Sequence, residues 1–339
     1  MSARPSMSLS LDLDNKWSYL KTHGNDAWRN YPGYLPLVVP RILDFLAQRD
    51  LSITFFIVGK DATLDENKEV LGEIAAAGHE IGNHSFIHDP WLHLYSATDL
   101  EREFEKAEEA IEAVTGIRTR AFRGPGFSLS TDTLNVLGNR GYDFDATAFP
   151  NALNPLARAY FFSKSRLTAA EKKQRSALFG TFSDALRPVK PYRWTLPSGP
   201  LLEIPVTTLP LFRVPIHFSY LLYLASFSRM AARLYTRTAV ALCRATRTEP
   251  SLLLHPLDFM GEEDDDDLAF FPAMNMPVTR KLEIMDELFA VLLDNFDACT
   301  MGEFARNACG TDVALREFPP SFPHRSEGMN LGPSAGNDA

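Results

Sequence analysis

Gly78-His-Glu-Ile-Gly-Asn-His-Ser-Phe-Ile-His88 is the stretch of sequence that decides the fold. Gly78 ends a helical pattern, and His79–Asn83 is expected to form a strand directly after it. His84 and His88 then follow the strand. Two histidines four positions apart fall on one face of a helical turn, so both imidazoles can reach one cation. Such pairs also occur by chance on solvated helices, so the pair alone leaves both interpretations open.

Strand and helix patterns alternate on both sides of this stretch. The expected strands are Met7–Leu13, Ser52–Val58, His79–Asn83, Thr119–Arg123, Tyr142–Thr147, the hairpin of Arg193–Leu196 with Leu201–Val206, Ser251–His255 and Ala298–Met301. The expected helices are Leu35–Gln48, Leu64–Ala77, a charged helix capped by Thr98 and Glu101 and ending at Gly116, Thr131–Arg140, Ile216–Arg244 and Thr279–Asn295. This alternation predicts right-handed βαβ units and a parallel sheet, either open or closed into a barrel.

The 339 residues are expected to form a single catalytic domain over about 7–310, preceded by a short arm at 1–6. A basic, aromatic segment without clear periodicity interrupts the alternation as an insertion at about 151–191. The segment 320–339 is rich in Pro, Gly, Ser and Asn, which predicts a disordered tail.

Composition excludes several classes of protein. The net charge of -9 argues against general affinity for nucleic acid, because phosphate binding needs clustered Lys and Arg. Three scattered cysteines are too few for a disulfide framework or a thiolate zinc site. The N-terminus lacks the apolar core of a secretory signal, and no stretch is long enough to span a bilayer. A cytoplasmic protein is therefore expected.

Leu11-Asp-Leu-Asp14 closes the first expected strand with two acids. Asp12 and Asp14 point the same way, because side chains alternate along a strand with period 2. A catalytic metal site needs about three protein ligands and one open position. One aspartate and two histidines meet that need and leave the second aspartate free to act as a base. The competing interpretation is a strand that ends in a solvated acidic turn.

Two further motifs also follow expected strands. Arg123-Gly-Pro-Gly-Phe127 offers a guanidinium that can pair with one of the acids, and glycines that let the backbone approach a ligand. A simple tight turn explains the glycines equally well. His255 ends the apolar strand Ser251–His255. In parallel α/β folds reactive residues gather at the C-terminal ends of the strands, so all four motifs are expected at one edge.

Taken together, these motifs resemble the polysaccharide deacetylase family, the NodB-homology group also called carbohydrate esterase family 4. The family's ordered motifs match Ser10-Leu-Asp-Leu-Asp-Asn15, His84-Ser-Phe-Ile-His88, Arg123-Gly-Pro125 and Leu252-Leu-Leu-His255, and the resemblance covers about Met7 to Met301. The acids depart from the commoner adjacent pair. The family's Asp-plus-Trp motif has no clear match, which leaves Asp145, Glu203 or Asp258 to orient His255.

This resemblance implies an α/β fold, a distorted (β/α) barrel of about seven parallel strands. It implies that Asp14, His84 and His88 bind Zn²⁺ or another divalent metal such as Co²⁺, Mn²⁺ or Ni²⁺. Asp12 would be the general base, His255 the general acid, and Arg123 the residue that holds Asp12. The substrate would lie against Pro125, Gly126 and Phe127, with the amide of Gly126 as an oxyanion donor.

The implied reaction is metal-dependent hydrolysis of a non-peptide amide. The favoured form is N-deacetylation or deformylation of an amino sugar, in a polysaccharide or a lipid-linked saccharide. Two alternatives remain open. One is a hydrolase of a small cyclic amide or ureide, which the spaced acids also suit; the other is a non-catalytic saccharide-binding protein.

The expected helix at 216–244 has a basic side. Arg229, Arg233 and Arg237 recur at helical spacing, opposite Leu221, Leu222, Leu224 and Phe227. A basic amphipathic helix can make peripheral contact with the inner face of a membrane and suits a lipid-linked substrate. A barrel helix with a solvated face is the competing interpretation. The remaining histidines, His23, His79, His93 and His217, are expected to be structural or on the surface.

Overall fold

The structure, a computed structural model, describes residues 4–153, 184–310, 315–320 and 322. Its strands are β1 (Ser6–Leu13), β2 (Thr54–Ile57), β3 (Glu80–Asn83), β4 (Ala121–Phe122), β5 (Phe144–Asp145), β6 (Tyr192–Leu196), β7 (Gly199–Glu203), β8 (Ser251–Leu254), β9 (Asp297–Cys299) and β10 (Glu317–Phe318). They form one sheet in the order β10-β6-β7-β5-β4-β3-β2-β1-β8, with β9 paired to β1. The expected α/β fold is confirmed.

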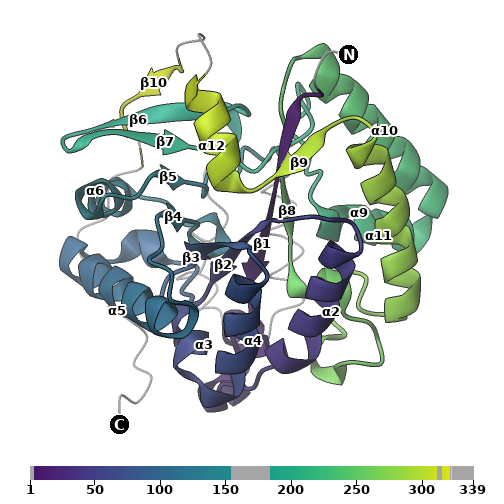
Figure 1. The fold of residues 1–339 in the computed structure, drawn as a ribbon, viewed down its shortest axis with the longest axis horizontal. Helices are drawn as coiled ribbons and strands as arrows, with labels where there is room; N and C mark the ends of the chain where they lie inside the picture. Colours follow the sequence, from purple (N-terminus) through teal and green to yellow (C-terminus); the bar gives the residue numbers. More distant parts are fainter. Residues whose placement is uncertain (1–3, 154–183, 311–314, 321, 323–339) are drawn as a thin grey trace.

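Seven consecutive strands of this order, from β7 to β8, run parallel, whereas β6 is antiparallel to β7 as the expected hairpin requires. The sheet order itself is open. The chain that continues from β7 nevertheless reaches β8, because Thr207 N donates to Ser251 O (2.9 Å). The sheet therefore curls so that the chain after β7 approaches β8, and β1 lies near the centre of the molecule (Figure 1).

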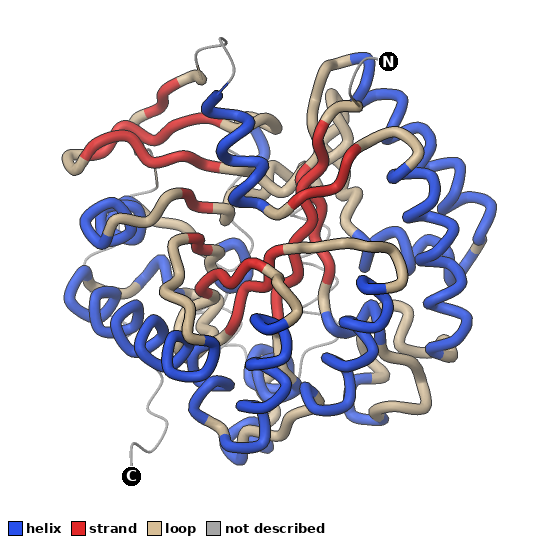
Figure 2. The backbone as a smooth tube through the Cα atoms, viewed as in Figure 1, coloured by secondary structure: helices blue, strands red, loops and turns tan. Residues whose placement is uncertain are grey.

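Helices cover the outside of the strands (Figure 2). They are α1 (Lys16–His23), α2 (Leu35–Ala47), α3 (Gly59–Thr63), α4 (Asp65–Ala76), α5 (Ala97–Thr115), α6 (Thr131–Arg140), α9 (Phe218–Phe227), α10 (Arg229–Ala245), α11 (Val278–Leu293) and α12 (Met301–Gly310). In Figure 1, α5 and α6 lie on one side of β1 and α9 to α11 on the other, with α2 to α4 below it. Among the described residues, no helix combines the length and the apolar character needed to cross a membrane.

Strand β1 shows how the sequence positions the site. Leu9, Leu11 and Leu13 are fully buried in the main core, which also contains residues of α2, α9 and α11. Ser10 and Asp12 point to the opposite side, as the period of 2 requires, and both contact the Arg123 side chain. The core on one face therefore orients the polar residues on the other.

Three expected elements are wrong in detail. The cap of α5 is Ser96, whose Oγ accepts from Asp99 N (3.1 Å), two residues before the expected box. The helix expected at 216–244 is broken at Ser228, where an extended residue (φ -158°, ψ 109°) caps α10. Met301 begins α12 instead of ending a strand, because its backbone amide is held by Thr54 Oγ1 (2.8 Å). Sequence pattern alone does not reveal such tertiary contacts.

The structure leaves other expectations untested. The residues outside the description include most of the insertion expected at 151–191 and most of the tail expected at 320–339. They also include half of the arm expected at 1–6. Within the insertion, the described part is 151–153 and 184–191, with a 3₁₀ turn at Asp184–Leu186.

Candidate metal centre

Asp14, His84 and His88 lie together at the C-terminal ends of β1 and β3. Each offers one ligand atom, and the three atoms lie within 4.8 Å of one another. Asp14 Oδ1 is 3.3 Å from His84 Nε2 and 2.9 Å from His88 Nε2. All three residues are buried. A carboxylate with two imidazoles is a donor set suited to zinc and to similar divalent ions.

The segment between the two histidines is not the helical turn that the sequence predicts. Ser85 (φ 63°) and His88 (φ 49°) have left-handed backbone conformations, which are uncommon for residues other than glycine. Side-chain hydrogen bonds stabilise this loop: Ser85 N donates to Asn83 Oδ1 (2.8 Å), and His88 N donates to Ser85 Oγ (3.2 Å). The imidazoles converge because of this loop geometry, and their rings are 5.0 Å apart.

Buried polar side chains hold the same loop from outside. Glu103 of α5 accepts hydrogen bonds from Phe86 N (2.9 Å) and Ile87 N (2.7 Å). Lys21 donates to Ile87 O (2.9 Å) and also pairs with Asp89. Burial raises the pKa of Glu103 to about 7, although the two backbone hydrogen bonds lower it in part. The loop that presents His88 is therefore anchored by two helices.

Hydrogen bonds around the triad fit a cation. His84 Nδ1 donates to Arg123 O (2.6 Å), which leaves its Nε2 as a lone-pair donor facing Asp14. Asp14 Oδ1 and His88 Nε2 are buried, and although they are close they do not meet in hydrogen-bond geometry. Burial by itself raises the pKa of Asp14, but the neighbouring imidazoles of His88 and His84 outweigh it and hold the pKa well below its ordinary value. A divalent ion would satisfy these atoms.

Arg123 pairs with Asp12, as expected from the sequence. Its Nη1 donates to Asp12 Oδ1 (2.8 Å) and to Ser10 Oγ (2.8 Å), and its Nε donates to Ala146 O (2.9 Å). The Arg123 side chain is fully buried and stacks on the ring of Phe56, 4.5 Å from the ring centre. This bidentate use of the guanidinium, toward Asp12 and Ser10, fixes the orientation of the Asp12 carboxylate.

His255 follows β8 and lies at the same end of the sheet. Its Nδ1 is 3.0 Å from Ser219 Oγ, at the start of α9, and its backbone amide donates to Asp258 Oδ2 (2.8 Å). Burial raises the pKa of Asp258, although His255 and a hydrogen bond from Ser219 lower it in part. Ser219 therefore connects His255 to Asp258, the one of the three suggested acids that contacts His255.

Asp145 and Glu203, the other two suggested acids, contact each other instead. Glu203 accepts from Trp194 Nε1 (2.7 Å) and from Ala148 N (2.9 Å), and Thr147 Oγ1 donates to Asp145 Oδ1 (2.5 Å). Burial and the neighbouring carboxylate raise the pKa of Glu203 well above its ordinary value. Asp145 and Glu203 are the last residues of the neighbouring strands β5 and β7, and they contact each other rather than His255.

His217 is a site residue that the sequence analysis assigned to structure or surface. It is buried at the N-terminus of α9, and its ring lies 5.8 Å from that of His255. Burial, together with the charges of His255 and Arg123, lowers the pKa of His217 well below its ordinary value, so it is neutral at pH 7. Its nearness to His255 arises because α9 packs on β8, which no local sequence pattern signals.

Of the three expected substrate-binding residues, Phe127 belongs to an aromatic wall that reaches His217 through Phe149. Phe127 stacks near Phe149 (4.5 Å between ring centres), and Phe149 contacts His217 (5.8 Å). Pro125 is buried, whereas Gly126 is exposed and has a left-handed backbone (φ 58°). A Cβ at position 126 would lie 2.9 Å from Pro90 Cβ, so the turn requires glycine there.

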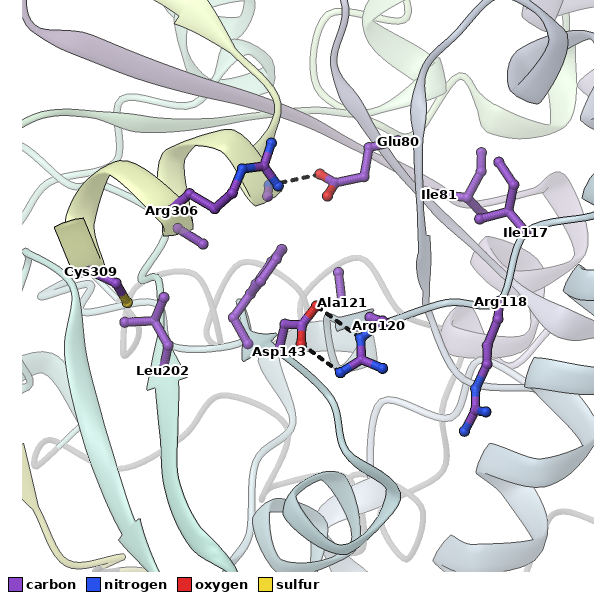
Figure 3. A pocket seen from close by; sticks show the side chains of 13 residues that line it. Glu80, Ile81, Ile117, Arg118, Arg120, Ala121, Asp143, Leu202, Arg306 and Cys309 are labelled. Carbon is purple, nitrogen blue, oxygen red and sulfur yellow. Dashed lines mark hydrogen bonds and ion pairs between the residues drawn. The ribbon is translucent and has the colours of Figure 1, made fainter.

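A hollow lies at the opposite end of the strands from the metal centre (Figure 3). Its lining includes Glu80, Ala121 and Phe144, which are the first residues of β3, β4 and β5. Arg120 on its rim pairs with Asp143 through two hydrogen bonds of 2.8 and 2.9 Å. This hollow contains none of the expected site residues and is separate from the metal centre.

Comparison with known proteins agrees with the predicted resemblance. The sequence model of the family described as polysaccharide deacetylase matches residues 26–144. The chain is 33% identical over 107 residues to a chitooligosaccharide deacetylase of Sinorhizobium fredii, which covers 31% of this chain and 48% of the relative. It is 31% identical over 106 residues to a chitin deacetylase of Colletotrichum lindemuthianum, a match that covers 30% of this chain and 42% of the relative. The matches span about half or less of these relatives.

Solved structures share the fold over nearly the whole chain. A putative polysaccharide deacetylase from Mycobacterium smegmatis superposes with a TM-score of 0.58 at 18% identity, covering 96% of both chains. The PuuE allantoinase superposes with a TM-score of 0.56 at 16% identity, covering 91% of this chain and 92% of the other. The expected NodB-like α/β fold is thereby confirmed.

Proposed function

We propose that this chain, which carries the polysaccharide deacetylase match at residues 26–144, is a metal-dependent hydrolase that removes the N-acyl group from an amino sugar. The observation that carries the proposal is the convergence of Asp14, His84 and His88 beside the Asp12–Arg123 ion pair. The relatives named as chitin and chitooligosaccharide deacetylases support a saccharide substrate.

Asp14, His84 and His88 would hold the cation. When bound, a divalent ion supplies Lewis acidity, which lowers the pKa of water toward about 7 and polarises an amide carbonyl. Zn²⁺ suits the donor set, and Co²⁺, Mn²⁺ or Ni²⁺ would bind the same atoms.

The protein's own residues supply the proton transfers. Asp12, held in place by the hydrogen bond from Arg123, takes a proton from the attacking water. His255 gives a proton to the departing nitrogen, because an amine leaves poorly unless it is protonated. Ser219 fixes the orientation of the His255 ring through Nδ1. The wall of Phe127 and Phe149 gives the sugar ring an apolar face to pack on.

A panel of substrates and variants tests the proposal. Wild-type protein should contain about one divalent metal by elemental mass spectrometry, and should release acetate or formate from chito-oligosaccharides or lipid-linked N-acyl amino sugars. His84→Ala should lose both metal and activity. His79→Gln, at the start of β3 and away from the triad, is the matched control and should keep both.

Asp12→Asn separates the two parts of the site. It should keep the metal and lose activity by about 10²–10⁴-fold, the usual contribution of a general base. Full metal content in His84→Ala would refute the metal centre. Turnover of allantoin with no release of acyl groups from any sugar would favour the cyclic-ureide alternative, whereas a metal-loaded protein that binds chito-oligosaccharides without hydrolysis would favour the non-catalytic one.

A further inference from the structure

Helices α9 and α10 carry a concentration of exposed apolar side chains. Among the described residues, seven of the nine exposed large hydrophobic side chains lie between positions 186 and 234. Four of them are on or between these two helices: Tyr223 (38% exposed), Phe227 (73%), Met230 (80%) and Leu234 (64%). We call these four residues the α9–α10 patch. Isolated exposed apolar residues are ordinary, but a contiguous group marks an interaction surface.

The α10 part of the patch points directly away from the core. At 3.6 residues per turn, Met230 and Leu234 lie on the face of α10 opposite the buried Ala232 and Ala239. Figure 1 shows α10 on the outer edge of the molecule. The break at Ser228 joins the exposed end of α9 to the exposed start of α10, so Phe227 and Met230 lie on either side of this corner.

The charge around the patch is opposite to that of the rest of the chain. The 45 residues from Ile204 to Thr248 contain six arginines and no aspartate or glutamate, whereas the remainder has 28 basic and 43 acidic residues. Arg233 and Arg237 are exposed on α10 beside Met230 and Leu234. On the neighbouring α11, Glu283 and Glu287 both pair with Arg229.

We propose that the α9–α10 patch docks the protein on an anionic lipid surface. Exposed Phe, Met and Leu side chains can enter the boundary between headgroups and acyl chains, while flanking arginines attract anionic lipid. Arg233 and Arg237, exposed beside the apolar side chains of α10, complement such a surface. The cytoplasmic location expected from the sequence would make it the inner face of the membrane.

The same helix joins the patch to the candidate site. The start of α9 carries His217 and Ser219 at the site, and its end carries Phe227 in the patch. Ten helical residues span about 15 Å, so docking would hold the site roughly that far from the surface contact. This inference does not depend on the proposed reaction, because binding to lipid is measured without any substrate.

Vesicle co-sedimentation of the full-length chain tests the proposal. Wild-type protein should bind vesicles of phosphatidylcholine with 30% phosphatidylglycerol about 30-fold or more tightly than vesicles of phosphatidylcholine alone, and high salt should weaken the binding. Arg233→Gln/Arg237→Gln should lose about 30-fold in affinity, since each arginine contributes roughly five-fold near an anionic surface. Met230→Ser/Leu234→Ser should lose at least ten-fold.

Matched controls use exposed residues elsewhere. Leu37→Ser (47% exposed) and Arg102→Gln (70% side-chain exposure) should bind as wild type does. The variants are at exposed positions, and unchanged thermal unfolding verifies that they fold. Equal binding to both kinds of vesicle, or wild-type binding by both double variants, would overturn the proposal. Absence of lipid binding together with self-association that Met230→Ser/Leu234→Ser abolishes would also overturn it, in favour of a second copy as the partner.

Discussion

Replacing Arg123 with methionine tests whether a buried guanidinium holds Asp12 in place. Arg123 is fully buried and Asp12 is nearly so, with 5% side-chain exposure, and they are joined by a 2.8 Å ion pair. Methionine keeps much of the side-chain volume and the contact with Phe56, but it removes the charge and every hydrogen bond of the guanidinium. The carboxylate of Asp12 would then be buried without its partner.

The structure sets the expected size of the effect. Breaking one side of a buried ion pair costs about 3–5 kcal/mol, because the remaining charge is left uncompensated. With a urea m-value of about 3 kcal/mol per M, the unfolding midpoint should fall by roughly 1–1.7 M. Asp12→Asn/Arg123→Met carries no buried charge at this position, so it should recover part of the loss.

Equilibrium urea unfolding in the presence of a chelator measures this effect without any contribution from bound metal. Arg120→Met is the matched control, because Arg120 pairs with Asp143 at the surface, where both side chains are 57% exposed. Exposed pairs contribute about 0–1 kcal/mol. The reasoning is refuted if Arg123→Met and Arg120→Met lose equal stability, or if adding Asp12→Asn makes Arg123→Met less stable.

Three further predictions concern the residues around the site. Ser219→Ala should lower kcat about ten-fold with little change in KM, because the hydroxyl orients His255 without contacting substrate. Ser219→Thr, which keeps a hydroxyl, should restore most of the rate. A change in KM as large as the change in kcat would contradict this role. The pKa of Glu103 is raised to about 7, so the folded state loses stability as pH rises from about 4.5 to 7. Glu103→Gln should therefore be more stable than wild type at pH 8, by up to about 3 kcal/mol in the free energy of unfolding measured with urea. At pH 4.5 the two proteins should be equally stable. A stability difference that does not change with pH would contradict this account. Gly124→Ala should cost about 1–3 kcal/mol, since a Cβ there would lie 2.4 Å from a backbone carbonyl oxygen, whereas Gly72→Ala, with nothing closer than 3.8 Å, should cost none.

Much of the fold was predictable because the relevant signals are local. Buried parallel strands are short apolar runs bounded by glycine or proline, and helices show their caps and their 3.6-residue period. For α6, the expected bounds and the observed Thr131–Arg140 coincide, with Ser130 and Gly141 as caps. The α10 cap at Ser228 was missed because the apolar positions on both sides continue one helical pattern.

The sequence predicts that Asp12, Asp14, His84, His88, Arg123 and His255 lie at one edge of the sheet, and the reason is topological. Each follows or ends an expected strand, and the C-terminal ends of parallel strands meet at one edge. The alternation of side chains on β1 also predicts that Asp12 and Asp14 point together. The structure confirms the approach of Asp14 to both histidines and the pairing of Asp12 with Arg123.

Only the tertiary structure decided how the site is held. Ser85 and His88 have left-handed backbones, so a helical turn was the wrong local interpretation. Asn83 binds the amide of Ser85, and Glu103, from a helix farther along the chain, binds the amides of Phe86 and Ile87. His217 and Ser219 reach His255 through the packing of α9 on β8. Sequence periodicity determines which residues lie at the strand ends. It does not determine which distant helices pack against them, because those contacts depend on long-range packing that no local pattern encodes.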